Sequence, residues 1–212
     1  MISKEEIHQQ LVKRHGSLLQ KKIEQSHVCI CGLGGLGSHI AMILARLGVG
    51  HLHLIDFDEV DLSNIHRQNY NLDQIGMKKT QACKQNLERI NPYIEITISD
   101  EKITEQNYLS LIQEEIVCEA FDRANTKAWF VNAVLENLPQ TYIVASSGMV
   151  GLDSANGIQT RKITSHFFIC GDETSDLDSG LNLVASRVVV CAAHQAHAVL
   201  NIIQRKKDHD EQ

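Results

Sequence analysis

The feature that most constrains the fold is a glycine-rich turn between an apolar run and a helical pattern. The run His27–Cys31 (HVCIC) predicts a buried strand, and residues 38–47 have the apolar spacing of a helix. Between them, residues 32–37 (GLGGLG) match G-x-G-x-x-G. The first glycine permits a tight bend, the second lets a phosphate approach the backbone, and the third lets the helix lie close to the strand. We expect a nucleotide at this turn, bound by Gly32, Gly34, Gly35, Leu36 and Gly37.

An acidic residue follows the next strand, as such a nucleotide site requires. The alternating run His51–Ile55 predicts a second strand, and Asp56 follows it directly. A carboxylate at this place accepts hydrogen bonds from ribose hydroxyls. This context favours nucleotide binding over a merely structural turn. This context does not identify which nucleotide binds, because a dinucleotide dehydrogenase and an ATP-consuming enzyme share these features.

The rest of the chain continues the alternation of strands and helices. We expect further strands at 93–99, 116–121 and 142–146, and helices at 79–90, 104–112, 125–137 and 182–204. Residues 158–170 predict an antiparallel pair, because no helix separates their two apolar segments. The pattern therefore predicts an α/β fold with a Rossmann-like, doubly wound sheet, mostly parallel, with antiparallel strands near its C-terminal part.

The composition of the chain limits which classes of partner and which cellular compartment we expect. The chain carries 26 acidic against 20 basic residues and a formal charge of −6, which disfavours broad binding to a nucleic-acid backbone. Its apolar runs are far shorter than the roughly 20 residues of a membrane span. The segment MISKEEIHQQ lacks a signal-peptide pattern, and the six cysteines form no C-x-x-C pair. We expect no nucleic-acid partner, no membrane contact, a cytoplasmic location and reduced, mostly buried thiols.

The stretch after the second strand resembles a family signature. Residues 56–68 (DFDEVDLSNIHRQ) resemble the D-x-D-x-V-x-x-S-N-x-x-R-Q pattern of the ThiF/MoeB family, the bacterial relatives of ubiquitin-activating enzymes. Residues 76–79 (GMKK) and 119–122 (EAFD) continue the resemblance in the order and spacing of that family. The resemblance implies an N-terminal helical arm at 1–26, a ThiF-type nucleotide-binding adenylyltransferase domain at 27–205, and a solvated tail at 206–212.

The resemblance also implies a chemistry and a set of site residues. Such enzymes use MgATP to adenylylate the C-terminal Gly-Gly carboxylate of a small ubiquitin-like carrier protein, and they release pyrophosphate. Because an anion attacks a polyanion, cations and a metal must cancel the repulsion. The implied cofactors are ATP and Mg²⁺. Arg67 and Lys79 would bind phosphates, Asn64 would hydrogen-bond their oxygens, and Asp122 would hold or orient Mg²⁺.

Simpler interpretations of the same residues stay open. Arg67 and Lys79 could be solvated surface charges, and Asp122 could cap the helix that follows it. Asp58 is implied equally in ribose binding and in support of the loop. The neighbouring Lys78 leaves the position of the family's lysine open by one residue.

Arg14 matches the family more loosely than the other site residues. It lies well before the glycine turn, where the family has an arginine that reaches ATP across a dimer interface. The resemblance therefore implies a homodimer in which Arg14 of one copy serves the nucleotide of the other.

The chain departs from the family at its cysteines. Many members bind zinc through two C-x-x-C pairs, which are missing here, so no zinc is expected. Relatives that bind their carrier covalently use a cysteine in the segment before the last helix, and residues 171–180 (GDETSDLDSG) contain none. Cys170 is the only nearby candidate, and its apolar strand (HFFIC) predicts a buried thiol. A separate sulfur donor would then complete sulfur transfer.

The run SSGMVG…QTRKI…FFICGD most resembles a compact ThiF-like subgroup of thiamine biosynthesis. The predicted function is a sulfur carrier protein adenylyltransferase with a ThiS-like, Gly-Gly-ending partner. Two alternatives remain: an NAD-dependent oxidoreductase, for which no proton-transferring residue is evident beyond scattered histidines, and a non-catalytic module that binds a ubiquitin-like protein. The presence of Arg67, Lys79 and Asp122 together favours the enzyme.

Overall fold

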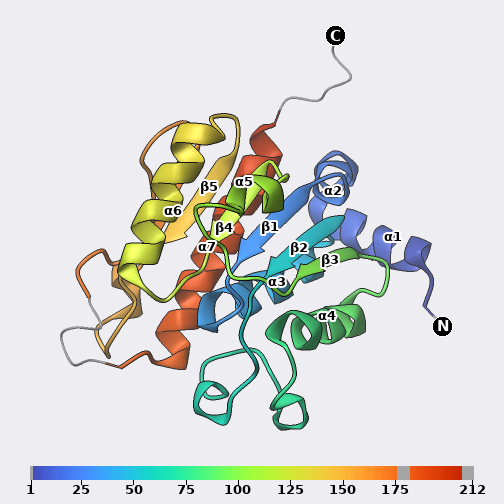
Figure 1. Cartoon of the computed structure of the whole chain (residues 1–212). Coiled ribbons are helices and arrows are strands. Elements are labelled where there is room, and N and C mark those ends of the chain that lie inside the picture. The colour runs from blue at the N-terminus through green and yellow to red at the C-terminus, as the bar shows by residue number, and fades with distance from the viewer. Residues whose placement is uncertain (1, 176–181, 207–212) are drawn as a thin grey trace.

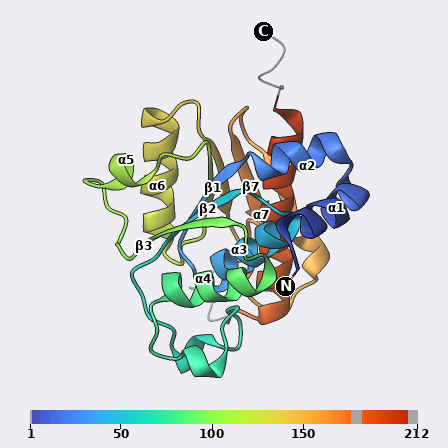
Figure 2. The same cartoon turned by 90° about the vertical axis from the view of Figure 1, so that its right-hand side faces the viewer.

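A computed structural model describes residues 2–175 and 182–206 and shows a seven-stranded sheet between two layers of helices (Figures 1 and 2). The strand order is β3-β2-β1-β4-β5-β7-β6, and every neighbouring pair is parallel except β6–β7. The strands are β1 (His27–Cys31), β2 (His51–Ile55), β3 (Glu95–Ser99), β4 (Ile116–Glu119), β5 (Tyr142–Ser146), β6 (Gln159–Lys162) and β7 (Phe167–Gly171). The predicted α/β sheet with its antiparallel pair is confirmed.

The helices divide between the two faces of the sheet. They are α1 (Lys4–His15), α2 (Ser17–Glu24), α3 (Gly35–Leu47), α4 (Lys79–Ile90), α5 (Tyr108–Leu111), α6 (Ala124–Asn137) and α7 (Ala185–Arg205). One face is covered by α3, α4 and α7, and the other by α5 and α6 (Figure 2). Among the described helices, none combines the length and the apolar character needed to cross a membrane.

The central strands are apolar on both faces because helices cover both sides of the sheet. In β1, Val28 and Ile30 join the core beneath α3 and α7, whereas Cys29 and Cys31 face the core beneath α5 and α6. All four side chains are fully buried. This alternation explains why the HVCIC run has no polar face.

The α2 helix belongs to the body of the molecule rather than to a detached arm. Ile23 is fully buried in the main core, and its carbonyl accepts a hydrogen bond of 3.2 Å from the Gly50 amide. The α1 helix, which begins at a Ser3–Glu6 capping box, has no fully buried residue. The N-terminal segment thus consists of one packed helix and one peripheral helix.

Several element boundaries differ from the sequence prediction; β3 begins two residues late and α7 three residues late. The α3 helix begins at Gly35, because the glycines of the turn themselves form its first turn. The β4 strand ends at Glu119, two residues early. Of the helix predicted at 104–112, only α5 is helical. The Asn107 side chain accepts a hydrogen bond of 2.7 Å from the Thr104 amide and closes a turn there. Residues 176–180 of the segment before α7, and 207–212 of the predicted tail, lie outside the described residues.

The core beneath α6 offers a test of the fold. Phe130 is fully buried and makes edge-to-face contacts with Phe121 and Trp129, at ring-centroid distances of 5.2 and 5.7 Å. Replacing Phe130 with Ala is expected to lower the free energy of unfolding by about 3–5 kcal/mol. In Leu109→Ala, a control on the half-exposed surface of α5, the change should stay within about 0.5 kcal/mol. Urea denaturation followed by circular dichroism measures both, and equal losses would contradict the assignment of the core.

Candidate nucleotide-binding site

The glycine turn between β1 and α3 has space for backbone only. Gly32 has φ +92°, and a Cβ placed there would lie 2.8 Å from the Ala120 carbonyl oxygen. A Cβ on Gly37 would lie 1.8 Å from the Gly32 carbonyl oxygen, so the third glycine lets α3 approach the strand. No side chain caps the N-terminus of α3. Its first amides are therefore available to an anion, where the helix dipole also favours negative charge.

The carboxylate of Asp56 connects this turn to the end of β2. Its Oδ2 accepts a hydrogen bond of 2.6 Å from the Leu33 amide, and its Oδ1 accepts one of 2.8 Å from the Asp58 amide. Asp56 is 8% exposed. Each carboxylate oxygen has a second lone pair, so hydrogen bonds from a ribose hydroxyl remain compatible with these contacts.

Of the two neighbouring lysines, only Lys79 points into the structure. Lys79 is 6% exposed and its Nζ lies 2.8 Å from Asp58 Oδ2, while its amide donates to the Asp58 carbonyl at 3.0 Å. Lys78 is half-exposed and pairs with Glu59 at 3.1 Å. The Asp58 side chain thus holds the Lys79 ammonium in place.

Arg67 and Asn64 lie together beside the second half of the glycine turn. The Arg67 guanidinium donates to Asn64 Oδ1 at 3.0 Å, and Arg67 Cγ is 3.8 Å from the position of a Cβ on Gly35. The Arg67 carbonyl is 3.2 Å from Nε2 of His39 on α3, which fixes the backbone here. The structure therefore places both predicted residues next to the turn.

Gln68 also belongs to this group, although the sequence analysis did not single it out. Gln68 is 7% exposed, and its Nε2 lies 3.7 Å from the position of a Cβ on Gly34. Its buried Oε1 has no hydrogen-bond partner within the described part of the chain. The signal was present in the sequence, since Gln68 is the last residue of the signature stretch 56–68.

Asp122 lies beyond the end of β4, on the other side of the glycine turn. Ala120 and Phe121, which precede it, contact the position of a Cβ on Gly32. Asp122 is exposed, and no described residue pairs with its carboxylate. It does not cap α6, whose N-cap is Arg123 without a side-chain hydrogen bond. An exposed, unpaired carboxylate is the kind of hard oxygen ligand that Mg²⁺ takes.

A buried ion pair that the sequence did not reveal holds the strand ends near Asp122. Lys127 of α6 lies 2.9 Å from Oε1 of the fully buried Glu119, and it donates to Ser146 Oγ at 2.7 Å. Glu119 also accepts from the Phe121 amide at 2.7 Å. These contacts join the ends of β4 and β5 to α6 and fix the path of the chain into Asp122.

Arg14 is not brought to the other predicted residues within one chain. It is exposed on α1, and Leu11 of that helix contacts Gly48 at the C-terminal end of α3. The glycine turn lies at the opposite end of α3, a helix of 13 residues and therefore about 20 Å long. Any contact between Arg14 and a bound nucleotide requires another copy of the chain.

Cys170 is a buried thiol rather than an exposed nucleophile. It is fully buried on β7, and burial raises its pKa to about 11, although a hydrogen bond from Thr160 opposes this shift. All six cysteines are buried and unpaired, as the sequence predicted. A thiol in an apolar site that is protonated at neutral pH is a poor nucleophile.

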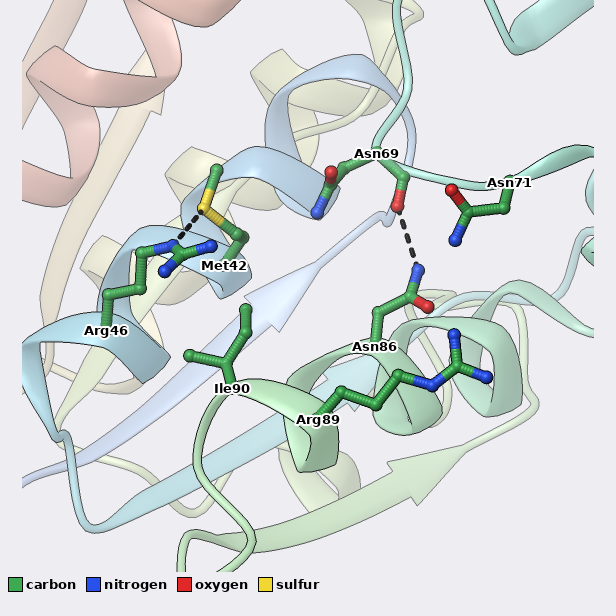
Figure 3. Close-up of a pocket in the computed structure, with 7 residues that line it drawn as sticks. All are labelled: Met42, Arg46, Asn69, Asn71, Asn86, Arg89 and Ile90. Atoms are coloured by element: carbon green, nitrogen blue, oxygen red, sulfur yellow. Dashed lines mark hydrogen bonds between the residues drawn. The ribbon is translucent and has the colours of Figure 1, made fainter. Parts of the chain in front are cut away.

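A separate hollow of about 260 Å³ lies between α3 and α4 (Figure 3). Arg46 and Arg89 stand on opposite helices, with Met42 and Ile90 between them. Three asparagines, 69, 71 and 86, complete the lining, and Asn86 donates to the Asn69 carbonyl at 3.0 Å. None of the predicted site residues lines this hollow.

The ThiF family model matches residues 7–211. Among similar proteins, the molybdopterin-synthase adenylyltransferase of Haemophilus influenzae is 39% identical over 110 residues, covering 51% of this chain and 45% of the relative. The tRNA threonylcarbamoyladenosine dehydratase of the same organism is 32% identical over 130 residues, covering 60% and 50%. The chain thus spans half or less of the length of these relatives.

Solved structures share the fold. The Escherichia coli tRNA N6-threonylcarbamoyladenosine dehydratase in complex with ATP superposes with a TM-score of 0.84 at 22% identity, over 96% of this chain and 97% of that chain. Escherichia coli MccB with ATP gives 0.73 at 22% identity, over 95% and 64%.

The burial of the cysteines predicts slow thiol chemistry. In the native protein we expect no thiol to react readily with Ellman's reagent at mildly alkaline pH, because burial raises the pKa of every one of them. Denaturation should release six reactive thiols. A native thiol that reacts as fast as free cysteine, and that disappears in Cys170→Ser, would contradict the assignment of Cys170 to the core.

Proposed function

The chain belongs to the ThiF family, and from this premise we propose that it adenylylates the C-terminal Gly-Gly carboxylate of a small ubiquitin-like sulfur carrier protein. The observation that carries the proposal is the grouping of Arg67, Asn64, Lys79 and Asp122 around a glycine turn. Cations and a metal-binding carboxylate beside a phosphate-binding turn are what attack by one anion on another requires. This grouping favours the adenylyltransferase over the nicotinamide-dependent alternative.

In the proposed reaction, a carboxylate oxygen of the carrier bonds to the α-phosphorus of ATP, and the bond to the pyrophosphate oxygen breaks. The products are carrier–CO–AMP and pyrophosphate. The amides at the start of α3 bind phosphate oxygens, and Asp56 accepts from the ribose. Arg67 and Asn64, already joined to each other, bind the α-phosphate as charge moves to the leaving group.

Lys79 and Asp122 act from opposite sides of the turn. Asp58 holds the Lys79 ammonium in place, so little rearrangement is needed when the phosphates arrive. Asp122 has the exposed, unpaired carboxylate that holds Mg²⁺. When bound, Mg²⁺ neutralises charge on the phosphates and orients them.

The partner and the pathway are part of the proposal. The resemblance of residues 146–172 supports a ThiS-like carrier and thiamine biosynthesis, with a separate sulfur donor completing the transfer because Cys170 is buried. We further propose a cytoplasmic homodimer in which Arg14 contacts the nucleotide of the partner copy.

A second candidate substrate is a carboxylate on tRNA, favoured by the resemblance to the threonylcarbamoyladenosine dehydratases. The formal charge of −6 argues against it, because a tRNA backbone is recognised largely by positive charge. Exchange of labelled pyrophosphate into ATP distinguishes the two candidate substrates. The exchange would require a Gly-Gly carrier in the first case and a tRNA carboxylate in the second. It also identifies a non-catalytic binding module, which would give no exchange with any acceptor.

Asp122 provides the first test of the reaction. With a Gly-Gly-ending carrier and MgATP, we expect carrier-dependent return of label from pyrophosphate into ATP. Asp122→Ala should reduce this exchange by about 10²–10³-fold, the usual effect of removing one group that stabilises transition-state charge. Glu136→Ala, which removes an exposed acidic residue from α6, is the control and should leave exchange unchanged. Absence of exchange in the unaltered protein with all Gly-Gly carriers would refute the proposal.

The two adjacent lysines provide a matched pair. Lys79→Met should lower exchange by about 10²–10³-fold, because it removes a buried cation at the phosphate site while keeping the length of the side chain. Lys78→Met, which removes a half-exposed charge, should change exchange less than about twofold. Thermal unfolding of both variants controls for folding. A large loss of exchange in Lys78→Met and a small one in Lys79→Met would instead assign phosphate binding to Lys78.

A further inference from the structure

A buried cluster of metal-ligating side chains lies beneath the glycine turn, on the face of the sheet covered by α5 and α6. Cys29 of β1 and His53 of β2 are register partners on adjacent parallel strands. Glu114, from the segment between α5 and β4, completes the group, and one ligand atom of each residue lies within 4.8 Å of the others. Neither the phosphate site nor the proposed reaction uses these side chains.

We propose that Cys29, His53 and Glu114 bind a divalent cation of the Zn²⁺ class. Thiolate, imidazole and carboxylate are the three protein ligand types that zinc accepts. This cluster is unrelated to the C-x-x-C pairs whose absence led us to expect no zinc. The inference stands independently of the proposed function.

The distances suit one small ion. In a tetrahedral zinc site, neighbouring ligand atoms lie about 3.3–3.8 Å apart, given metal–ligand lengths of about 2.0–2.3 Å. His53 Nδ1 lies 3.0 Å from Glu114 Oε1, and one ligand atom of each of the three residues lies within 4.8 Å of the others. Small movements of the side chains would therefore bring the three atoms onto one centre.

The partners of the ligands are also in place. His53 Nε2 lies 2.9 Å from Ser99 Oγ, so its N–H donates to that hydroxyl and Nδ1 faces the cluster. The second oxygen of Glu114 accepts from the Gln113 amide at 3.1 Å. A ligating histidine usually donates its other N–H in this way, which fixes its tautomer and its orientation.

The cluster lies in an apolar layer of the molecule. Cys29 is fully buried in the core that contains Tyr108 and Ile112, and His53 and Glu114 are 6% and 8% exposed. The His53 imidazole and the Glu114 carboxylate lie 3.0 Å apart, and a buried pair of this kind contributes little net stability by itself.

Metal binding balances the charges of the ligands by releasing protons. The dication replaces the proton of the Cys29 thiol and any proton on the ligating nitrogen of His53. With Cys29 and Glu114 as the anionic ligands the site is neutral. The ion would join β1, β2 and the segment before β4 three residues below Gly32 and Asp56, and so stabilise the strand ends that carry the turn.

The test uses the full chain, stripped of metal with a chelator and kept in excess Mg²⁺ so that oxygen-only sites are filled. Adding Co²⁺ should give a thiolate-to-metal charge-transfer band that saturates at one ion per chain, and Zn²⁺ should abolish it. Zn²⁺ alone should raise the midpoint of thermal unfolding. Cys29→Ala and His53→Gln should lose both effects, and Ser99→Ala should weaken binding by about 10–100-fold.

Cys118→Ala is the matched control, because it removes a buried thiol from the neighbouring strand on the opposite face of the sheet. It should keep the band and the thermal shift. Glu114→Gln preserves the shape of the side chain and covers the case in which the cysteine and histidine variants fail to fold. Lack of a charge-transfer band in the unaltered protein, or a band that survives in Cys29→Ala and Glu114→Gln, would overturn the proposal.

Discussion

The carboxylate of Asp56 is the constraint on which the nucleotide end of the molecule depends. It accepts one backbone hydrogen bond from the glycine turn, at Leu33, and one from the loop that follows β2, at Asp58. Asp58 in turn holds Lys79 through both its carboxylate and its carbonyl. One short chain of contacts therefore connects the glycine turn to the buried cation.

The order of the strands explains why residues far apart in sequence meet at this place. The chain passes from β1 outward to β2 and β3, and then returns to the other side of β1 with β4. The strand ends on both sides of β1 thus border one crevice, which is where ligands bind in open α/β sheets. Asp56 and Lys79 approach the turn from the β2 side, and Asp122 approaches it from the β4 side.

The parts of the fold that depend on local periodicity were predictable from the sequence. The bounds of β1, β2, β5 and α4 agree with the apolar patterns, because turn residues delimit each of them. The start of α3 was not predictable from the sequence, because glycine disfavours helices. Residues 35–37 are helical because the turn packs closely against the strand. Likewise, the resemblance located Arg67 and Asn64, but it did not reveal that Gln68 lies beside the same turn or that His39 contacts the Arg67 carbonyl.

Contacts between neighbouring strands and across the sheet could not be predicted from the sequence, for a different reason. Pairing Cys29 with His53 requires the register of two strands that a helix separates, and pairing Glu119 with Lys127 requires the position of a helix on the far face. A shift of one residue in register would reverse which face each side chain occupies, so the pattern alone could not specify these pairs. Arg14 shows a further limit of prediction from one sequence. Because α1 packs at the far end of α3, any contact between Arg14 and the nucleotide would involve two chains. One chain carries Arg67, Lys79 and Asp122 near the turn and leaves Arg14 exposed on α1, so the proposed role of Arg14 at the nucleotide would need a second copy.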